Sequence, residues 1–457
     1  MSNRTELSST TIVAPATAPG GAIALIRLSG PEAIALTERV FSQPLTQAPG
    51  HTLHFGTISD NDRMLDEVLV SVFRAPRSYT GEEMVEISCH GSAYITHEIL
   101  SLLTRHGAVP AAAGEFTQRA FLNGKLDLSQ AEAVADLIAS ESGAAHRIAL
   151  NQMRGGYATE LAGLREKLLH IASLLELELD FSEEDVEFAD RSELQGLLTE
   201  ILHRCRLLAG SFRTGNVLKN GVPVAIAGAP NAGKSTLLNR LVGEERAIVS
   251  EVAGTTRDLI EESITLGGIR FRFIDTAGLR HTEDSIEALG IERAKERIRH
   301  ATLVLFLLAE PRTPAEVLES IDALKLSDEQ HLILLFNKQD LWDTAPLAEA
   351  LSHRWPTLSL SARSGEGLEE LQTLLIDSVG DNRSADALVV SNIRHYEALL
   401  QAAAALERGL TGLENTLSAD LVSEEIRQVL HHLGTITGEI TTDDILYHIF
   451  SKFCIGK

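Results

Sequence analysis

The sequence is poor in cysteine and in aromatic residues. Its 457 residues include three cysteines, two tryptophans and five tyrosines. Cys89, Cys205 and Cys454 are odd in number and far apart, and none belongs to a CxxC pair. This usage argues against a disulfide framework and a zinc finger, and it is typical of a protein that stays in the cytoplasm.

Long apolar runs are also lacking. No stretch reaches the ~18 consecutive apolar residues that a membrane-spanning helix requires. The opening stretch, MSNRTELSSTTIVAPATAPG, has neither the basic flank nor the continuous apolar core of an export signal. We therefore expect a cytoplasmic protein without a membrane partner.

Positive charge is scarce. The chain has 40 Lys and Arg against 64 Asp and Glu, which gives a formal net charge of -24. A surface of this charge repels a polyanion over most of its area, and the sequence shows no compensating basic tail. Contact with a nucleic acid must therefore come through a local patch or through a partner.

The length and the residue patterns predict several domains, because one ordinary core is too small for this chain. Short alternating runs such as AIALIRLSG and EMVEISCHG dominate the beginning, with one helix expected at Tyr94–His106. Leucines recur every three or four residues from Leu161 to Leu179, and a similar period returns after residue 390. Between these helical segments the chain alternates strands and helices. We predict a multidomain α/β and α fold: an α+β domain at 1–122, a discontinuous helical domain at 123–218 and 382–457, and an α/β domain inserted at 219–381.

VPVAIAGAPNAGKST carries a phosphate-binding loop. Gly228, Gly233, Lys234 and Ser235 match the pattern G-x-x-x-x-G-K-S between an apolar strand and a helix. The glycines let backbone N–H groups wrap phosphates, Lys234 reaches the β and γ oxygens as a catalytic cation, and Ser235 gives its hydroxyl to Mg²⁺. The helix N-terminus adds to anion binding, and a chance Gly-rich turn is the alternative. The predicted nucleotide contacts are Asn231, Ala232, Gly233, Lys234, Ser235 and Thr236.

NKQD at Asn337–Asp340 predicts guanine as the base. It follows the apolar strand HLILLF, as a base-reading loop at the carboxyl end of a strand should. The Asp340 carboxylate can accept two hydrogen bonds, from N1–H and the 2-amino group of guanine, and adenine offers no such pair of donors. The nucleotide contacts predicted here are Asn337, Lys338 and Asp340. Ser361, Ala362 and Arg363 resemble a supporting guanine loop, which would not by itself predict a guanine site.

Two further segments are typical of the switch loops of a Ras-like P-loop G domain. DTAG ends the strand RFRFI, which brings Asp275 near the Mg²⁺ water shell and the Gly278 N–H near the γ-phosphate. SEVAGTTRD offers hydroxyls for the Mg²⁺ shell, although a plain Ser/Thr-rich turn is the alternative. The predicted GTP contacts are Asp275, Thr276, Ala277 and Gly278, and Ser250, Glu251, Val252, Ala253, Gly254, Thr255 and Thr256. Leu279 follows DTAG where Ras-type GTPases place a water-orienting Gln, so hydrolysis needs another activating element.

Segments outside the G motifs carry a resemblance to a known family. They are GEFTQRAFLNGKLDLSQAEAVADLI at 114–138, AGTTRD and GIERA within the inserted domain, and FCIGK at 453–457. On these residues the chain resembles the MnmE family of bacterial tRNA modification GTPases, also called TrmE. Related GTPases such as Era and EngA share the phosphate loop and lack the N-terminal domain and the CIGK tail. The resemblance implies an N-terminal folate-binding domain that dimerises, a discontinuous helical domain and an inserted G domain.

The resemblance also implies how GTP is hydrolysed. A K⁺ ion takes the role of an arginine finger and forms its site fully when two G domains meet. Glu287 matches the glutamate that helps to position the attacking water, although a solvated charge on a helix is the alternative. The implied ligands are Asn231, Ser250, Val252 and Thr255 for K⁺, next to Gly254, and Ser235 and Thr256 for Mg²⁺.

A one-carbon site is implied in the same way. The matching positions are Arg27, Glu86, Lys125 and Lys457, which suit a tetrahydrofolate derivative, 5,10-methylene or 5-formyl. Without the resemblance each is a surface charge. Cys454 matches a family cysteine tied to tRNA modification, and an inert thiol is the alternative. The early loop PGGAIALIRLSG is shorter than the family pattern, and HGS replaces HGG, so the two departures from the family pattern both lie in the folate domain and concern the detail of one-carbon binding.

The resemblance implies partners and a pathway. The chain forms a homodimer and works with the flavoprotein MnmG, which carries FAD, in a heterotetramer or larger complex on tRNA. Together they add an aminomethyl or carboxymethylaminomethyl group at C5 of the wobble uridine. The alternative is an Era-like ribosome-assembly switch, which needs an RNA-binding module such as a KH domain, and none is found after residue 380. An inactive relative would lose Lys234, Asp275 or Asp340, and all three are present.

Overall fold

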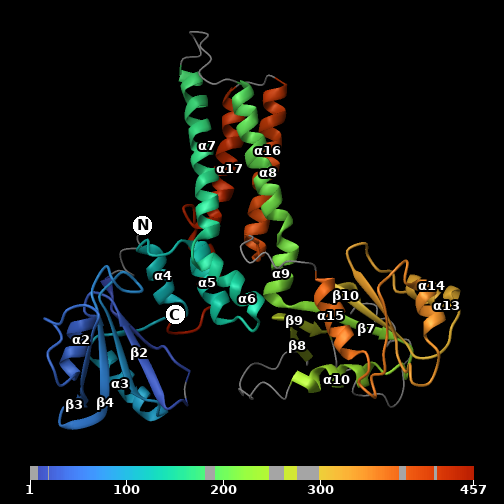
Figure 1. Ribbon diagram of the computed structural model, residues 1–457. Helices are drawn as coiled ribbons and strands as arrows, with labels where there is room; N and C mark the ends of the chain where they lie inside the picture. The colour runs from blue at the N-terminus through green and yellow to red at the C-terminus, as the bar shows by residue number, and fades with distance from the viewer. Residues whose placement is uncertain are drawn as a thin grey trace. The chain divides into compact units, whose positions relative to one another are not determined.

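The chain divides into two compact units. In the computed structural model (Figure 1), the outer unit consists of Met1–Ile138, Gln152–Cys205 and Ala398–Lys457, and the inserted unit consists of Ala139–Asn151 and Arg206–Glu397. No helix of the described residues has the length and apolar character needed to cross a membrane. The structure describes residues 9–18, 20–180, 191–245, 262–274, 298–379, 388–415 and 419–457.

The outer unit begins with a six-stranded sheet of order β3-β4-β5-β2-β1-β6. Neighbouring strands are antiparallel except for β1 and β6. The alternating runs predicted β2 to β5, whereas β1 and β6 are too short to show a period of two. The strands are Ile12–Pro15, Ile23–Ser29, Thr52–Asp60, Arg63–Phe73, Met84–His90 and Val109–Pro110, for β1 to β6.

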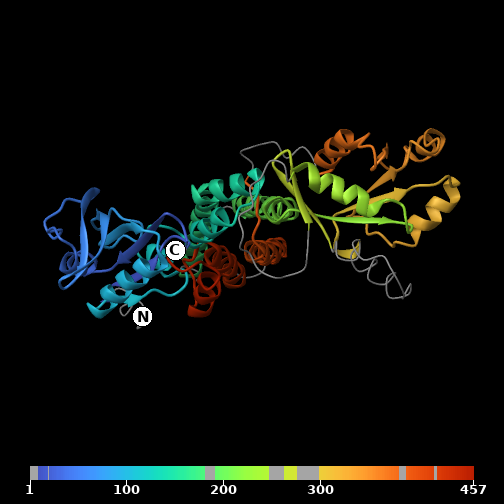
Figure 2. The same cartoon turned by 90° about the horizontal axis from the view of Figure 1, so that it is seen from below.

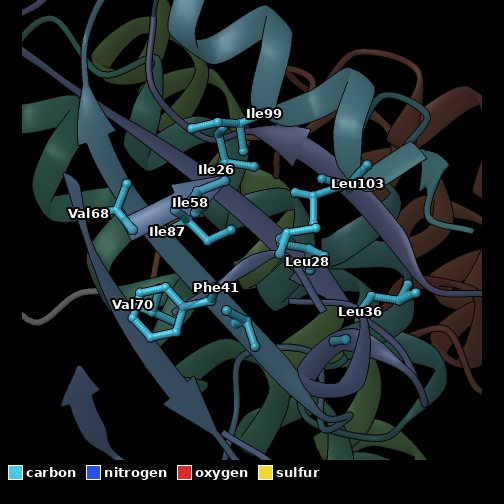
Figure 3. Packing of buried hydrophobic residues seen from close by; sticks show 14 of the residues in the cluster. Ile26, Leu28, Leu36, Phe41, Ile58, Val68, Val70, Ile87, Ile99 and Leu103 are labelled. Atoms are coloured by element: carbon cyan, nitrogen blue, oxygen red, sulfur yellow. The ribbon is translucent and has the colours of Figure 1, made fainter. Parts of the chain in front are cut away.

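One face of this sheet is buried under α2 (Ala33–Val40) and α3 (Ala93–Arg105). Successive strand residues point to opposite faces, so every second side chain enters this core. Figure 3 shows Ile26 and Leu28 of β2 packed with Ile87 of β5, and all three are fully buried. The helix expected at Tyr94–His106 is therefore confirmed as α3, and the α+β class of this region is confirmed.

A buried arginine fastens α4 (Glu115–Leu122) to the sheet. Arg119 is 1% exposed, and its guanidinium donates to the backbone oxygen of Thr10 at 2.8 Å. It also pairs with Glu82 at 3.2 Å and with Glu115 at 2.9 Å. Removing either carboxylate leaves a buried charge poorly matched, so this cluster fixes how α4 begins.

The rest of the outer unit is helical, as the leucine periods predicted. Figures 1 and 2 show α7 and α17 side by side, and their apolar faces meet in a buried seam. Leu168 and Ile171 of α7 are fully buried, as is Leu433 of α17. The helices are α5 Leu128–Ile138, α7 Gly156–Asp180, α8 Arg191–Gly210, α16 Ile393–Glu414, α17 Ala419–Thr437 and α18 Asp443–Phe450, of which α8 and α16 each extend into the inserted unit.

The inserted unit contains the predicted α/β fold. Its sheet has the order β12-β11-β10-β7-β9-β8, and only the β8–β9 pair is antiparallel. Its strands are β7 Val222–Gly228, β8 Glu262–Leu266, β9 Ile269–Phe273, β10 Leu303–Leu308, β11 His331–Phe336 and β12 Thr357–Ser359. Its helices are α6 Gly143–Met153, which runs on into the outer unit, α9 Phe212–Asn220, α10 Lys234–Glu245, α13 Pro314–Asp322, α14 Ala345–Leu351 and α15 Leu368–Ser378.

Both faces of this sheet are covered. Leu237 of α10 and Leu375 of α15 pack on one face, and Val317 of α13 and Leu351 of α14 pack on the other. The strands of such a sheet are buried on both sides, which explains why LVLFLL and HLILLF are almost continuously apolar. The carboxyl ends of the parallel strands lie at one edge, where open α/β sheets bind their ligands.

The entry and exit segments of the inserted unit are held together. Phe212 and Tyr396 stack with ring centroids 4.5 Å apart. The Ser211 hydroxyl accepts a hydrogen bond of 3.0 Å from the Val390 N–H. A Cβ on Gly215 would lie 2.2 Å from the Val390 oxygen, so only glycine permits this approach.

Candidate functional site

The phosphate loop lies between the end of β7 and the start of α10. Gly228, Asn231 and Gly233 have φ values of 143°, 60° and 96°, which curl the chain tightly around its own amides. The Lys234 ammonium donates to the oxygens of Gly228 and Ala229, both at 2.8 Å. Burial lowers the pKa of Lys234, and an anion in the loop would oppose that shift. The predicted loop residues therefore curl in front of the N-terminus of α10, a position that favours an anion.

Asn337 holds three loops together at this edge. Its side chain is buried, and its amide nitrogen donates to the Ala232 oxygen at 2.7 Å. Its amide oxygen accepts from the Ala362 N–H at 2.9 Å. A Cβ on Gly233 would lie 2.2 Å from the same amide nitrogen, which explains the glycine there. The phosphate loop, the NKQD segment and the SAR segment are thus joined through one amide.

The predicted base-reading residues follow β11 and β12. Lys338 has a φ of 62°, and Asp340 is exposed beyond it. Ser361 is 1% exposed and Arg363 is exposed. The Gln339 N–H donates to the Leu360 oxygen at 3.2 Å, which ties the two loops again. The arrangement leaves the Asp340 carboxylate accessible to a ligand at the edge of the sheet.

A small cavity of about 100 Å³ opens beside the phosphate loop. Its lining includes Asn231, Lys338 and two residues that the sequence motifs did not indicate, Glu310 and Arg312. These two form an ion pair of 3.0 Å just after β10. The only signal for them was their position after an apolar strand, where ligand-facing loops begin.

Several predicted site residues lie outside the described residues. They belong to the segment after α10, to the DTAG segment and to the segment that contains GIERA. These residues are Ser250, Glu251, Val252, Ala253, Gly254, Thr255, Thr256, Asp275, Thr276, Ala277, Gly278 and Glu287.

A second group of predicted residues meets in the outer unit, and we call it the tail site: Arg27, Glu86, Cys454 and Lys457 with the aromatic residues Tyr79 and Phe116. The Arg27 Nε donates to Glu86 at 2.9 Å, and its Nη2 lies 2.7 Å from the same oxygen. The Arg27 Nη1 donates to the Gly456 oxygen at 3.2 Å, although 429 residues separate them. Two neighbouring strands and the last residues of the chain therefore build one site.

Two aromatic rings surround the guanidinium. The Arg27 Cζ lies 5.5 Å from the centroid of the Tyr79 ring and 5.7 Å from that of Phe116. The Tyr79 hydroxyl hydrogen-bonds Thr117 at 2.8 Å, and burial raises its pKa. Motif reasoning missed both rings, because nothing in SYTGEE or GEFTQ marks an aromatic side chain that faces a distant arginine.

The C-terminal segment is fastened to the same site. Ala113 and Ile455 form a β-bridge, and Phe450 and Phe453 bury their rings against Leu128. Gly456 has a φ of 94°, and a Cβ there would lie 2.1 Å from the Pro15 oxygen. The tail therefore adopts one path along the sheet.

Lys457 is affected by its neighbours in the tail site. Burial and then the Arg27 charge lower its pKa, while Glu86 and Cys454 act in the opposite direction. Lys125 instead donates to the Pro76 oxygen at 3.1 Å, at the start of the loop that carries Tyr79. The structure thus brings three of the four predicted cofactor residues together and places the fourth beside the aromatic loop.

The three cysteines differ in access. Cys454 is exposed in the tail site. Cys89 and Cys205 are buried, and burial raises the pKa of both thiols, that of Cys205 to about 12. Since the thiolate is the nucleophile, Cys454 is the thiol available for reaction.

Two family models match the chain. Residues 11–125 match the model described as the GTP-binding protein TrmE N-terminus, and residues 128–454 match the model of the MnmE helical domain. Among solved structures, the G domain of the T. maritima FeoB iron transporter is 27% identical and covers 34% of this chain and 98% of its own, with a TM-score of 0.26.

Curated relatives match over nearly the full length. A protein of Christiangramia forsetii is 52% identical, over 98% of this chain and 99% of its own. A protein of Cytophaga hutchinsonii is 51% identical, over 98% of each chain. Both are named tRNA modification GTPase MnmE. Family models and full-length identity together show that this chain belongs to the MnmE family, also called TrmE.

Proposed function

We propose that this chain is the GTPase of a cytoplasmic tRNA-modifying complex. It hydrolyses GTP to GDP and phosphate, and with MnmG it adds an aminomethyl or carboxymethylaminomethyl group at C5 of the wobble uridine. Membership of the MnmE family and the names of the relatives support this assignment. In this proposal, residues 1–122 bind folate and dimerise, 123–218 and 382–457 form the helical domain, and 219–381 form the G domain.

The observation that carries the GTPase activity is the amide of Asn337 between the phosphate loop and the SAR loop. This contact fixes the distance between the phosphate-binding and base-binding ends of the site. Lys234 then binds the β- and γ-phosphates and stabilises the charge that develops during transfer. Asp340 selects guanine because its carboxylate accepts from two donors of that base.

The proposed nucleotide site also binds two cations. Ser235 stands in the first turn of α10 and offers the hydroxyl oxygen that Mg²⁺ prefers, with Thr256 as its second protein ligand. Asn231, exposed in the phosphate loop with a φ of 60°, offers an amide oxygen for K⁺. Mg²⁺ neutralises phosphate charge, and K⁺ supplies the positive charge of an arginine finger. Ser250, Val252 and Thr255 complete the K⁺ site, and Glu287 orients the attacking water.

The tail site fits a tetrahydrofolate derivative. Glu86, held in place by Arg27, supplies an acceptor for the amino group of the pterin ring, and Lys457 supplies a cation for the acidic tail. The partly exposed Tyr79 adds apolar ring surface, the buried Phe116 ring packs near Arg27 from inside, and Lys125 stands beside the loop of Tyr79. When bound, the folate supplies the one-carbon unit, and the exposed Cys454 is positioned next to it. FAD is supplied by the partner MnmG and is not assigned to this chain.

An apolar sheet face supports the homodimer. Phe55 and Leu69 are cross-strand partners, and they are 61% and 39% exposed. Leu53 on the same face of β3 is 62% exposed, and Ile23 of β2 is 65% exposed. The next register row of this face carries Arg27 and Glu86. An apolar patch of this kind is typical of a protein interface, and a second copy would cover it beside the tail site.

The central experiment compares GTP turnover in K⁺ and in Na⁺ at matched ionic strength. We expect faster turnover in K⁺, and Asn231→Ala should remove the difference. Equal rates in the unaltered protein would refute the role of K⁺. Modification is tested separately, by deleting the gene and analysing wobble uridine by mass spectrometry. An unchanged uridine would favour the ribosome-assembly switch over a modifying enzyme.

A further inference from the structure

A groove of about 880 Å³ lies in the outer unit, between α4 and α18. We call it the α4–α18 groove. Its walls are formed by these two helices, by the two residues before Gly114 and by the loop that joins α17 to α18. All of these segments belong to the outer unit, and the described residues that line the groove include none of the nucleotide site or the tail site.

Two glycines hold the walls of this groove close together. Gly114, just before α4, has a φ of 69°, and a Cβ there would lie 2.6 Å from the Phe450 oxygen. Gly438, just after α17, has a φ of 88°, and a Cβ there would lie 2.7 Å from the Phe121 ring. A larger residue at either position would push the helices apart, so the shape of the groove is fixed by the fold.

Apolar side chains form the floor of the groove. Leu446 and Phe450 of α18 are buried, and Phe121 and Leu122 of α4 are half-buried. Tyr447, one residue after Leu446, also lines the groove and is 74% exposed. Apolar surface with an exposed aromatic ring at its edge is typical of a surface that another molecule covers.

The charged side chains along the groove are all acidic. Glu439, Asp443 and Asp444 are exposed, and the described residues that line the groove include no Lys, Arg or His. Glu439 pairs with Arg165 of α7. Asp443 and Asp444 form no ion pair with another described residue, so their charge is available to a ligand. The groove therefore attracts cationic groups and repels a phosphate backbone.

We propose that the α4–α18 groove binds a basic amphipathic helix of a partner protein. The apolar face of that helix packs on Phe121, Leu122 and Tyr447, because the groove between two neighbouring helices accepts the ridge of a third. Its Lys or Arg side chains pair with Asp443 and Asp444. A second copy of this chain is less complementary, because its net charge is -24.

The position of the groove suggests what the bound partner is near. Ala113, in the groove wall, is paired in a β-bridge with Ile455, the residue after Cys454. Ser451, at the end of α18, also lines the groove and precedes Cys454 by a few residues. A helix docked here therefore lies against the segment that carries the exposed thiol.

Fluorescence anisotropy with the full chain tests this docking. The probe is a labelled helical peptide of Leu and Lys, about five turns long, with one apolar face. A second peptide has Glu in place of each Lys, and it should bind about tenfold more weakly. Asp443→Asn combined with Asp444→Asn should weaken binding of the Lys peptide by about fivefold, and Tyr447→Ser should do the same. All three side chains are exposed, so the fold should tolerate these changes.

The matched control removes the same charge elsewhere. Glu369 and Glu370 are exposed in the first turn of α15, as Asp443 and Asp444 are in the first turn of α18. Glu369→Gln combined with Glu370→Gln should leave binding of the Lys peptide unchanged. GTP turnover and binding of 5-formyltetrahydrofolate should be normal in every variant, so failure of the docking surface is distinguishable from failure of the proposed function.

Several results would overturn the docking surface. They are a Lys peptide that does not bind, a Glu peptide that binds equally well, and a control variant that weakens binding as much as the groove variants do. Sedimentation velocity of the chain alone examines the second copy: a weaker dimer in Tyr447→Ser would identify a second copy as the occupant. Binding of a labelled RNA that is lost in Tyr447→Ser would identify a nucleic acid instead.

Discussion

In the nucleotide site, Asn231 to Thr236 come from the phosphate loop and the first turn of α10, Asn337 to Asp340 come from the loop after β11, and the Asn337 amide joins the two. In the tail site, Arg27, Glu86 and Lys457 come from opposite ends of the chain. The phosphate-binding part of the first site follows from local backbone geometry, because a glycine-rich turn before a helix favours an anion by itself. The second exists only after the sheet has formed and the C-terminus has docked on it. The tail site therefore depends on the whole fold of the outer unit.

The largest expected effect is on the nucleotide site alone, and it tests whether the two sites are independent. Asp340→Asn should reduce GTP turnover by about 100-fold or more, because the altered side chain no longer accepts from both guanine donors. Turnover of xanthosine triphosphate should rise, since xanthine offers an acceptor to the new amide. Phosphate release with both nucleotides measures this change. Binding of 5-formyltetrahydrofolate should be unaffected, and a parallel loss would mean that the sites are not independent.

The reverse experiment uses Arg27→Met. It leaves the Glu86 carboxylate without its partner in a site where both side chains are less than 20% exposed. We expect folate binding to fall by about 100-fold, and stability of the outer unit to fall by about 3 kcal/mol. Calorimetry and thermal unfolding measure both. Arg105→Ala is the matched control, since it removes an exposed pair with Asp60 and should cost less than about 1 kcal/mol. Normal folate affinity in Arg27→Met would remove this residue from the site.

A substitution in the apolar face should affect dimerisation less strongly than Arg27→Met affects folate binding. Phe55→Glu places a charge at the centre of the proposed contact, so the dimer dissociation constant should rise by about 100-fold or less. Sedimentation velocity over a concentration series measures it. Leu169→Glu is the control, because Leu169 is 50% exposed on α7, away from this face. If both variants behave like the unaltered protein, another surface holds the dimer.

The smallest expected effect is a pH dependence of folate binding. In the proposed folate site the protonated amine of Lys457 binds a carboxylate of the ligand, and burial and the Arg27 charge lower the pKa of this amine. The folded-state pKa lies below the ordinary value, so binding is strongest below it and weakens as pH rises through it. We expect a loss of about tenfold, the contribution of one charged hydrogen bond. Titrations from neutral to alkaline pH should show it, and Lys457→Gln should show a flatter profile.

Sequence patterns predicted those elements and loops whose residues lie close together in the chain. HLILLF coincides with β11, and the apolar period of Leu161 to Leu179 lies within α7. The phosphate loop was predicted because its glycines and its lysine must be close in the chain to act together. β1 and β6 were missed because four and two residues are too few to establish an alternation.

The remaining features depend on tertiary contacts that no local pattern records. The role of Asn337 in joining loops requires knowledge of where Ala232 and Ala362 lie. Tyr79 and Phe116 belong to different elements and meet only around Arg27. Family resemblance named Arg27 and Lys457, and the structure added the rings between which the arginine lies.

The stacked rings of Phe212 and Tyr396 bear on how a domain could be inserted into this fold during evolution. The larger segment of the inserted unit, Arg206–Glu397, has its two ends close together, because Phe212 stacks on Tyr396 and Ser211 is hydrogen-bonded to Val390. A gene segment encoding such a unit can be gained or lost while the surrounding helices keep their register. For the same reason, a short glycine linker joining Ser211 to Val390 should replace the residues between them, which form most of the inserted unit, and leave an outer unit that folds and still binds folate.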